Sequence, residues 1–475
     1  MNRPGRDESP GNSQSSMPTR KVRPERRRFL DSRAARVARG KALRQRVPRS
    51  SHAVWSPPRD RPDVIDLLRA SDHWRRPELL PMRYGRMSIS PFAFLRGAAS
   101  VMARDLAATP VTGLQVQLCG DAHLSNFGVF ATPERDQVFD LNDFDETLRG
   151  PWEWDVKRLV TSLVVAGRRN RYRRVEIRQA ARTALRSYRE MMGAFAEMRY
   201  LDTWYFHLDV RTPPLPEARE LRRLISFAVG KARRHSGLQA FPKLTEAVRG
   251  RRRIRNDPPL IVHYDDALAE RLCRSLYRRY LETLPEERRM LLDRYTVADV
   301  ARKVVGVGSV GLECSVLLLL ADRDVPDPLF LQLKQATASA LEPYLARSPY
   351  ANHAERVVAG QHLVQEASDI FLGWSRLGDR DFYVRQLRDM KFSYDISSLG
   401  PREFIGQAEL CGTALARAHA RTGDPAGISG YLGNGPAFDR AVTAFAEAYA
   451  DQTERDYRSL QQAIRTGRVS SAVDV

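Results

Sequence analysis

The chain has 475 residues, of which 43% are apolar, which is enough for two or three domains with a substantial core. Its four cysteines are far apart and form no CxxC pair, which argues against a zinc ribbon or disulfide framework and favours a reducing compartment. The formal net charge is +20, yet no apolar run approaches the roughly 20 residues that cross a bilayer.

The basic excess is concentrated in residues 1–60, which are rich in Arg, Pro and Ser and are predicted to form a disordered tail. Arg27-Arg28-Phe29-Leu30 resembles part of a twin-arginine export signal, but charged residues follow where an apolar segment of about 7–15 residues is required. We therefore predict a cytoplasmic protein with no membrane partner. We expect only weak polyanion binding, through the tail, because no helix-turn-helix, zinc-finger or aromatic RNA-binding signature accompanies the charge.

Apolar periodicity predicts helices before and after a central polar stretch. The predicted helices are 91–107, 154–166, 351–367, 404–420 and 436–464. Residues 170–300 are charged and amphipathic and are predicted to be a helical subdomain, interrupted near 213–216 and 251–259. Strand-like runs are predicted at 114–118, 138–141, 304–320, 329–333 and 382–387.

The stretch from Gly120 to Asp155 carries the predicted chemistry. Asp121, His123 and Asn126 fall in one short turn between two strand-like runs. In a phosphoryl transfer, an aspartate can accept or orient the attacking hydroxyl, and an asparagine amide oxygen can bind Mg²⁺. We therefore predict Asp121 as the catalytic residue and Asn126 as a metal ligand. The alternative is a polar turn in which both side chains only bond backbone amides.

A second acidic turn, LNDFDE at residues 141–146, ends the next strand-like run. Carboxylates this close repel one another unless a cation lies near. Hard Mg²⁺ or Mn²⁺ takes oxygen ligands and completes its shell with waters and substrate phosphates. Asp143 and Asp145 are thus predicted metal ligands. The alternative is an exposed acidic turn.

These two turns carry a family resemblance. GDxHxxN, then a strand, an Asp-Phe pair and, about ten residues later, Trp-Asp resembles the aminoglycoside phosphotransferase and choline kinase branch of the protein-kinase-like fold. The resemblance implies Asp121 as catalytic base, Asn126 and Asp143 as metal ligands, and Asp155 as the structural aspartate at a helix start. The segments PFAFLRG, LNDFDE and YVRQLRDMK also resemble a bacterial family known as domain of unknown function 2252.

The chain departs from the phosphotransferase pattern in three ways. Cys119 stands where those enzymes usually have His, and Asp145 replaces the glycine of a strict Asp-Phe-Gly. The third departure is one of order, because no nucleotide-binding lobe precedes Gly120.

A glycine-rich segment later in the chain could supply that lobe. GVGSVG at 306–311 fits GxGxxG, in which backbone N–H groups approach phosphates, and the residues predicted to bind the nucleotide are Gly306, Gly308, Ser309 and Gly311. The run 329–333 ends in Lys334, as in the kinase lysine strand. Glu355 on the next helix is the predicted partner of Lys334, and Glu342 is the second choice. The alternatives are a tight hairpin for the glycines and an edge-strand surface position for the lysine.

A circular permutation accounts for this order of segments. We predict an α+β, two-lobed, protein-kinase-like fold with a large helical lobe and a small antiparallel-sheet lobe. The predicted divisions are a disordered tail at 1–60, a helical catalytic lobe at 61–294, a sheet lobe at 295–395 and helices returning to the large lobe at 396–475.

The predicted function is an ATP- and Mg²⁺- or Mn²⁺-dependent phosphotransferase acting on a hydroxyl of a small molecule. Only ten positions separate Asp145 from Asp155, too few for the long activation loop of a protein kinase. Two alternatives remain: a metal-dependent phosphoesterase that uses the GDAH segment as a metal loop, and a non-catalytic kinase-like binding protein that docks on nucleic acid or acidic partners through its basic tail. The acceptor and the transferred group, phosphoryl or nucleotidyl, are left open by the sequence.

Overall fold

A computed structural model describes residues 31–208, 226, 229–232, 237–264, 266–321, 327–387 and 391–472. Met1–Ser32 separates from one compact unit, Arg33–Val475, and the description below concerns that unit. The first thirty residues of the predicted tail, and the predicted interruption at 213–216, lie outside the described residues.

The prediction of disorder up to residue 60 is wrong from Arg33 onward. Helix α1 spans Arg33–Arg46, and a short 3₁₀ turn, η2, spans Arg49–Ala53. Alanine and arginine are strong helix formers. α1 also packs very closely on α16 (Pro425–Leu432): a Cβ at Gly40 would lie only 2.0 Å from the carbonyl oxygen of Gly427. Because this contact is made by the backbones of the two helices, the sequence of α1 shows no apolar stripe.

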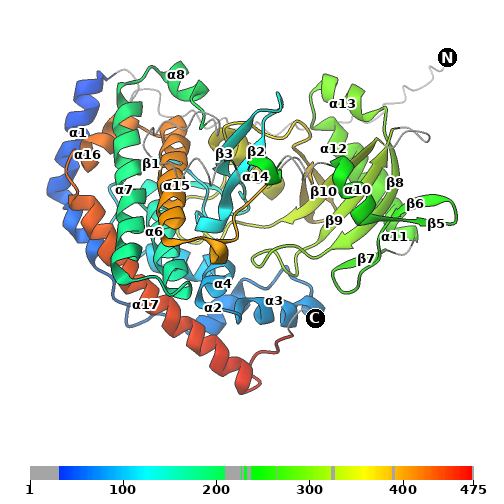
Figure 1. The fold of residues 1–475 in the computed structure, drawn as a ribbon, viewed down its shortest axis with the longest axis horizontal. Helices are drawn as coiled ribbons and strands as arrows, with labels where there is room; N and C mark the ends of the chain where they lie inside the picture. Colours follow the sequence, from blue (N-terminus) through cyan, green and yellow to red (C-terminus); the bar gives the residue numbers. More distant parts are fainter. Residues whose placement is uncertain are drawn as a thin grey trace, which may run out of the picture. The chain divides into compact units, whose positions relative to one another are not determined.

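Helices build most of residues 33–208 and 391–472 (Figure 1). Besides α1 and α16 they are α2 (Val64–Ala70), α3 (Leu80–Met87), α4 (Pro91–Gly97), α5 (Ala99–Leu106), α6 (Trp152–Arg169), α7 (Arg174–Glu197), α8 (Tyr200–Tyr205), α15 (Pro401–Thr422) and α17 (Ala437–Arg465). The helices predicted at 154–166, 404–420 and 436–464 are confirmed as α6, α15 and α17. The helix predicted at 91–107 is broken at Ala98, whose backbone (φ −115°, ψ 39°) leaves the helical region.

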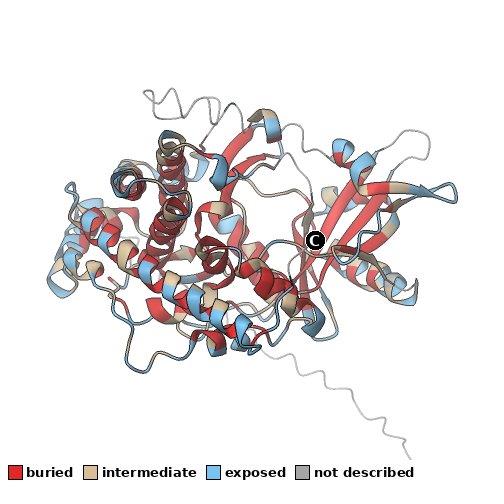
Figure 2. Ribbon diagram, turned by 60° about the horizontal axis from the view of Figure 1, so that its bottom comes forward, coloured by how far each residue is buried: buried red, intermediate tan, exposed pale blue. Residues whose placement is uncertain are grey.

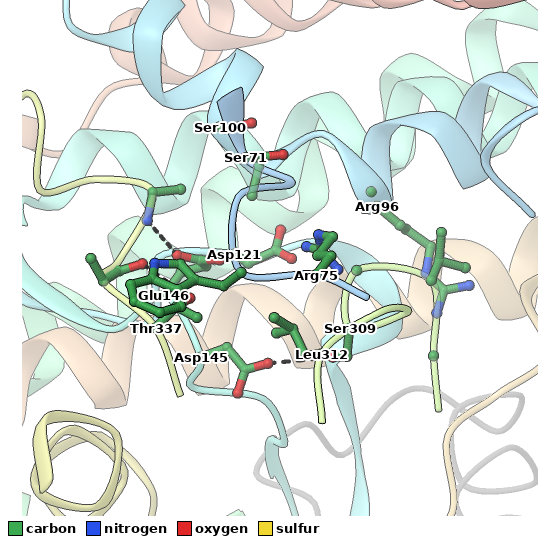
Figure 3. Close-up of a pocket in the computed structure, with 18 of the residues that line it drawn as sticks. Ser71, Arg75, Arg96, Ser100, Asp121, Asp145, Glu146, Ser309, Leu312 and Thr337 are labelled. Atoms are coloured by element: carbon green, nitrogen blue, oxygen red, sulfur yellow. Dashed lines mark hydrogen bonds between the residues drawn. The ribbon is translucent and has the colours of Figure 1, made fainter. Parts of the chain in front are cut away.

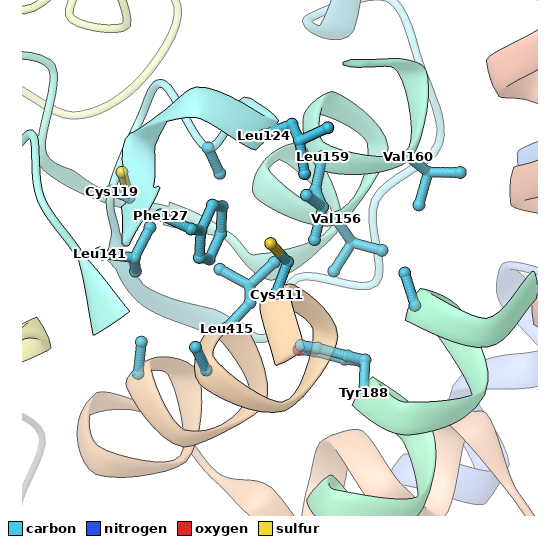
Figure 4. Close-up of a cluster of buried hydrophobic side chains, with 14 of the residues drawn as sticks. Cys119, Leu124, Phe127, Leu141, Val156, Leu159, Val160, Tyr188, Cys411 and Leu415 are labelled. Carbon is cyan, nitrogen blue, oxygen red and sulfur yellow. The ribbon is translucent and has the colours of Figure 1, made fainter. Parts of the chain in front are cut away.

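The main apolar core lies under most of these helices, and a separate cluster joins α2 and α3 to the end of α17. α7 packs along α15, and α6 packs along α17. Figure 4 shows Phe127, Leu159, Cys411 and Leu415 meeting in this core, with Tyr188 from α7 at its edge. All five side chains are at most 2% exposed. The core therefore supports the polar turns from below.

Two small antiparallel pairs frame the polar turns. β1 (Gln115–Leu118) pairs with β4 (Leu148–Pro151), and β2 (Phe127–Ala131) pairs with β3 (Gln137–Leu141). Leu118 lies opposite Leu148, and Phe127 lies opposite Leu141. Residues 119–126 and 142–147 therefore connect the same two pairs and lie together.

The remaining part is a six-stranded antiparallel sheet with the strand order β11-β12-β10-β9-β8-β7. Its strands are β7 (Ile261–His263), β8 (Thr296–Lys303), β9 (Cys314–Leu320), β10 (Pro328–Ala336), β11 (Gly373–Leu377) and β12 (Arg380–Gln386). The strands predicted at 329–333 and 382–387 are confirmed, whereas the run 304–320 becomes a strand only from Cys314. Residues 305–313 form bends and turns, because Gly306 and Gly311 adopt positive φ.

Apolar side chains alternate between the two faces of the sheet. Leu317 and Leu319 of β9 join a cluster with the helices α11 (Asp266–Arg271), α12 (Arg278–Glu282) and α13 (Glu286–Leu292). Val316 and Leu318 join a cluster on the other face with Phe241 of α10 (Gly237–Leu244). Figure 2 shows the central strands almost wholly buried. Both faces are thus covered, which explains the continuous leucine run.

The helical subdomain predicted at 170–300, with an interruption near 251–259, contains strands at 245–263 that were not predicted. A hairpin of β5 (Thr245–Val248) and β6 (Arg251–Ile254) precedes β7, which joins the large sheet. Arg249 and Gly250 turn this hairpin with φ of 49° and 76°, a conformation suited to a two-residue connection. The charged composition hid these strands. The sheet and the helices on it therefore begin before the predicted boundary at residue 295.

The α+β class is confirmed, with antiparallel sheets and a large helical part. α14 (His353–Val364) follows β10 and confirms the helix predicted at 351–367. Within the described residues, we find no helix with the length and apolar character needed to span a membrane.

Candidate functional site

A cavity of about 510 Å³ lies where three distant parts of the chain meet (Figure 3). One wall comes from residues 67–100, another from the two polar turns and a third from the glycine segment and the end of β10. The sequence-predicted residues that line it are Asp121, Asn126, Asp143, Asp145, Gly306, Gly308 and Ser309. Gly311 and Lys334 stand beside this lining. Side chains separated by almost 190 positions in the sequence therefore share one cavity.

The first polar turn is fixed from the start of α6. Both carboxylate oxygens of Asp155 accept backbone N–H groups, from Cys119 at 2.7 Å and from Gly120 at 3.0 Å. Gly120 has φ of 86°, and a Cβ there would lie 2.2 Å from the carbonyl oxygen of Glu146. Only glycine fits this position, where the two polar turns touch.

His419 of α15 completes the support beneath this turn. Its Nε2 lies 3.4 Å from Asp155 and its Nδ1 lies 2.9 Å from the hydroxyl of Tyr188. The ring is fully buried, away from the cavity. His419 is therefore part of the support and not of the reacting surface.

Asp121 forms an ion pair with Arg158, which projects from the second turn of α6. Arg158 also donates to the carbonyl of Leu95 at 2.9 Å and is almost fully buried. Burial raises the pKa of Asp121, although Arg158 and Arg96 oppose that rise. His123 stands 3.6 Å from Asp121, and burial lowers the pKa of its imidazole well below the usual value. The predicted catalytic carboxylate thus has a fixed guanidinium behind it.

Asn126 links the two polar turns. Its side-chain Nδ2 donates to the carbonyl of Asp121 at 2.8 Å, and its own carbonyl accepts the N–H of Asn142 at 2.9 Å. With the amide nitrogen facing the backbone, the amide oxygen is the atom that can serve a ligand. Asn126 thereby ties the position of Asp121 to the start of the second turn.

Lys334, in the middle of the sheet on β10, reaches the second turn. Its ammonium forms an ion pair with Asp145 and lies 3.9 Å from Asp143. Asp145 also accepts from the hydroxyl of Tyr383 at 2.8 Å and from Ser309 Oγ at 3.4 Å. Burial alone would raise the pKa of Asp145, but Lys334 and Tyr383 hold it below its ordinary value. One carboxylate therefore joins the acidic turn, the sheet and the glycine segment.

Asp143 is less well satisfied than Asp145. Its Oδ1 is buried without a hydrogen-bond partner, and burial raises the pKa of this carboxyl despite Lys334. Among the described residues, no group of three His, Cys, Asp or Glu could hold a metal ion. Asn126, Asp143 and Asp145 all line the cavity, and their side-chain oxygens are of the kind that Mg²⁺ takes together with phosphates and water.

The glycine segment is held by residues 75–86 through its carbonyl groups. Arg86 donates to the carbonyl of Gly306 at 2.6 Å, Arg75 donates to that of Val310, and the N–H of Arg76 donates to that of Gly311 at 2.8 Å. Gly308, by contrast, has only the carbonyl oxygen of Arg96 near the position of a Cβ, at 3.5 Å. The tip of the segment is therefore open to the cavity.

The predicted pairing of Glu355 with Lys334 is wrong. Glu355 lines a different cavity, and within the described chain the ion pairs of Lys334 are made with Asp143 and Asp145. Glu342, the second choice, lies 3.9 Å from Arg356 instead. Arg356 is the residue of α14 that points to the site, and it donates to the carbonyls of Asp145 and Thr147 at 2.8 and 2.6 Å. The residue of α14 that contacts the acidic turn is therefore Arg356, one position after the predicted Glu355.

Sequence reasoning missed several residues of this site. Arg158 and Tyr383 lie in apolar runs and read as ordinary members of a helix and a strand. Arg75 precedes the polar turns and carries no motif, and Arg96 lies in PFAFLRG, a segment that indicated the family but no binding role. A charged residue within an apolar helical stripe, such as Arg158, was the one available signal, because such residues are seldom buried unless paired.

Residues 75–463 match the model of a family described as "Uncharacterized protein conserved in bacteria (DUF2252)". The match covers most of the chain and bears out the resemblance inferred from PFAFLRG, LNDFDE and YVRQLRDMK. No curated protein and no solved structure matches the chain.

Proposed function

The chain belongs to this bacterial family, whose description states no activity, and from the site itself we propose that it is an ATP-dependent phosphotransferase. The acceptor would be a hydroxyl group of a small molecule. The observation that carries the proposal is the contact of Lys334 with the acidic turn, at a cavity that the glycine segment and Asp121 also line. A lysine, a flexible backbone loop, paired acids and a separate aspartate are the parts that phosphoryl transfer needs.

Each residue has a role in this proposal. The backbone N–H groups near Gly308 would face the triphosphate, and Lys334 would turn from Asp145 toward its phosphates. Asn126, Asp143 and Asp145 would hold Mg²⁺, which when bound neutralises charge on the phosphate oxygens. Asp121 would orient the acceptor hydroxyl and take up its proton, with its raised pKa bringing its basicity closer to that task.

The shape of the second turn favours a small acceptor. The acidic turn leads directly into β4, which begins at Leu148 and pairs with β1 in antiparallel orientation. Arg356 and Ser339 hold this short connection through the backbone carbonyls of Thr147 and Glu146. No long substrate-binding loop can be formed between Asp145 and Asp155.

We further propose that this is a kinase-like arrangement in permuted order. The support is the antiparallel sheet with Lys334 on an inner strand, the helix α14 after it, and α15 lying under the catalytic turn. The departure is the countercharge of Lys334, which is an aspartate of the acidic turn and not a helix glutamate. The phosphoesterase alternative needs a group of metal-binding side chains that is missing from the described residues.

Calorimetry with Mg·ATP tests the proposal directly. The wild-type protein should bind Mg·ATP, while Lys334→Met and Asp143→Asn should each weaken binding by about tenfold or more, the value of a charge-assisted contact. Arg149→Ala, on the exposed side of β4, is the matched control and should bind as wild type. Turnover on a panel of alcohols and aminoglycosides would then identify the acceptor. Unchanged Mg·ATP affinity in both site variants would overturn the assignment.

A further inference from the structure

Three described arginines line the cavity, and they differ in whether their guanidinium groups contact other protein groups. Arg75 and Arg83 both contact Asp72 at 3.3 Å, and each also donates to a backbone carbonyl. The side chain of Arg96 has no hydrogen bond or ion pair to any described residue, and its Nε, like those of Arg75 and Arg83, is buried without a hydrogen-bond partner. A buried guanidinium nitrogen without an acceptor is costly unless a ligand satisfies it.

The backbone that carries Arg96 is held on both sides. Arg158 donates to the carbonyl of Leu95 at 2.9 Å, and Arg83 donates to the carbonyl of Gly97 at 3.0 Å. Both of these arginines are buried. Because two buried guanidinium groups fix the residues before and after it, Arg96 projects from a rigid base at the end of α4. Such preorganisation is typical of a binding group.

The surroundings of Arg96 indicate an anionic ligand. Three of the four cavity acids have a donor: Asp121 has Arg158, Asp145 has Lys334 and Glu146 has the N–H of Ala340, while the fourth, Asp143, lies 3.9 Å from Lys334. The two cationic donors, Arg158 and Lys334, are not part of the cavity lining, whereas Arg96 lines the cavity together with the acids. The carbonyl oxygen of Arg96 also lies beside Gly308, at the open tip of the glycine segment. Arg96 thus stands between that tip and Asp121.

We propose that Arg96 binds the terminal phosphoryl group, the group that is transferred. This rests on the proposed function, since the glycine segment would cover the triphosphate and Asp121 would hold the acceptor. A planar guanidinium can donate two hydrogen bonds to phosphate oxygens and stabilise the charge that they carry during transfer. The same chemistry could instead serve an acidic group on the acceptor, and the experiment separates the two sources.

The test compares Mg·ATP and Mg·ADP affinity in wild type, Arg96→Ala and Arg96→Lys, with Arg149→Ala as control. The expected result is that Arg96→Ala loses about tenfold to a hundredfold in affinity for ATP and less than about twofold for ADP, with Arg96→Lys between. Equal losses for both nucleotides, or no loss, would overturn the assignment. So would an Arg96→Ala effect confined to the Michaelis constant of an acidic acceptor. Thermal unfolding of Arg96→Ala checks that the fold is kept.

A third ligand separates this inference from the function. If the wild-type protein binds neither nucleotide, the proposed function fails. Tripolyphosphate binding then tests the assignment of Arg96 by itself. If Arg96→Ala binds tripolyphosphate more weakly than wild type, Arg96 is an anion-binding residue. If the two proteins bind it equally, or neither binds it, the assignment is wrong.

Discussion

Replacing Lys334 by methionine tests how the acidic turn is held together. Lys334 is 2% exposed and contacts Asp145, with Asp143 at 3.9 Å. Removing one partner of a fully buried ion pair costs roughly 3–5 kcal/mol. The side chains of Asp145 and Asp143 are 24% and 35% exposed, and Tyr383 still donates to Asp145. We therefore expect a smaller loss, about 2 kcal/mol of unfolding free energy.

A double-mutant cycle isolates the ion pair from the packing of the lysine stem. Urea unfolding at pH 7 is measured for wild type, Lys334→Met, Asp145→Asn and the double variant. The double variant should lose about 1–2 kcal/mol less than the two single losses together, because asparagine needs no countercharge. Burial alone would raise the pKa of Asp145, but the lysine lowers it below 3.8. The stabilisation is therefore complete at neutral pH and declines as pH falls below that value.

Additivity would refute this reasoning. If the single losses sum to the double loss within about 0.5 kcal/mol, Lys334 contributes only its packing. Lys243→Met, at an exposed position of α10, is the control for the chemical change and should leave the unfolding free energy nearly unchanged.

Three further predictions follow from the geometry. In urea unfolding, Gly120→Ala should lower the unfolding free energy by about 3 kcal/mol, because a Cβ there overlaps Glu146 and the backbone has positive φ. Gly250 also has positive φ but has open space around it, so Gly250→Ala should lower the unfolding free energy by only about 1 kcal/mol. Burial raises the pKa of Glu366 to about 8, so the stability that this residue contributes should fall as pH rises from about 4.5 to 8. Glu366→Gln should therefore remove a decline of roughly 3–4 kcal/mol between urea titrations at pH 5 and pH 8. Glu355→Gln should leave Mg·ATP affinity unchanged in calorimetry, because Glu355 lines a different cavity; a loss like that of Lys334→Met would restore the original pairing.

Local patterns were sufficient for much of the fold. α15 and α17 follow from apolar residues at helical spacing, and β10 and β12 follow from β-branched and leucine runs bounded by turns. The two polar turns were also placed correctly after strands, because each follows an apolar run directly, although the strands that come next, β2 and β4, were not predicted. In all these cases the information lies within one segment of the chain.

The rest depends on contacts between segments. α1 is held by the close approach of two glycines, and the hairpin at 245–254 is arginine-rich on its exposed positions, so neither has an apolar pattern. The direction of α14 was misjudged by one residue, which exchanged Glu355 for Arg356. Periodicity gives the face of a helix that is buried, but the choice of partner across the interface depends on geometry that one segment does not contain.

The cations of this site differ in what they do, and the difference is measurable. Arg158 and Lys334 each contact a carboxylate and lie at least 97% buried, so their loss leaves a charge without a partner. Removing either should therefore change stability and ligand affinity together. Arg96 contacts no carboxylate within hydrogen-bond or ion-pair distance among the described residues, so Arg96→Ala should change ligand affinity with little effect on unfolding. A large stability loss in Arg96→Ala would mean that Arg96 supports the fold as Arg158 does.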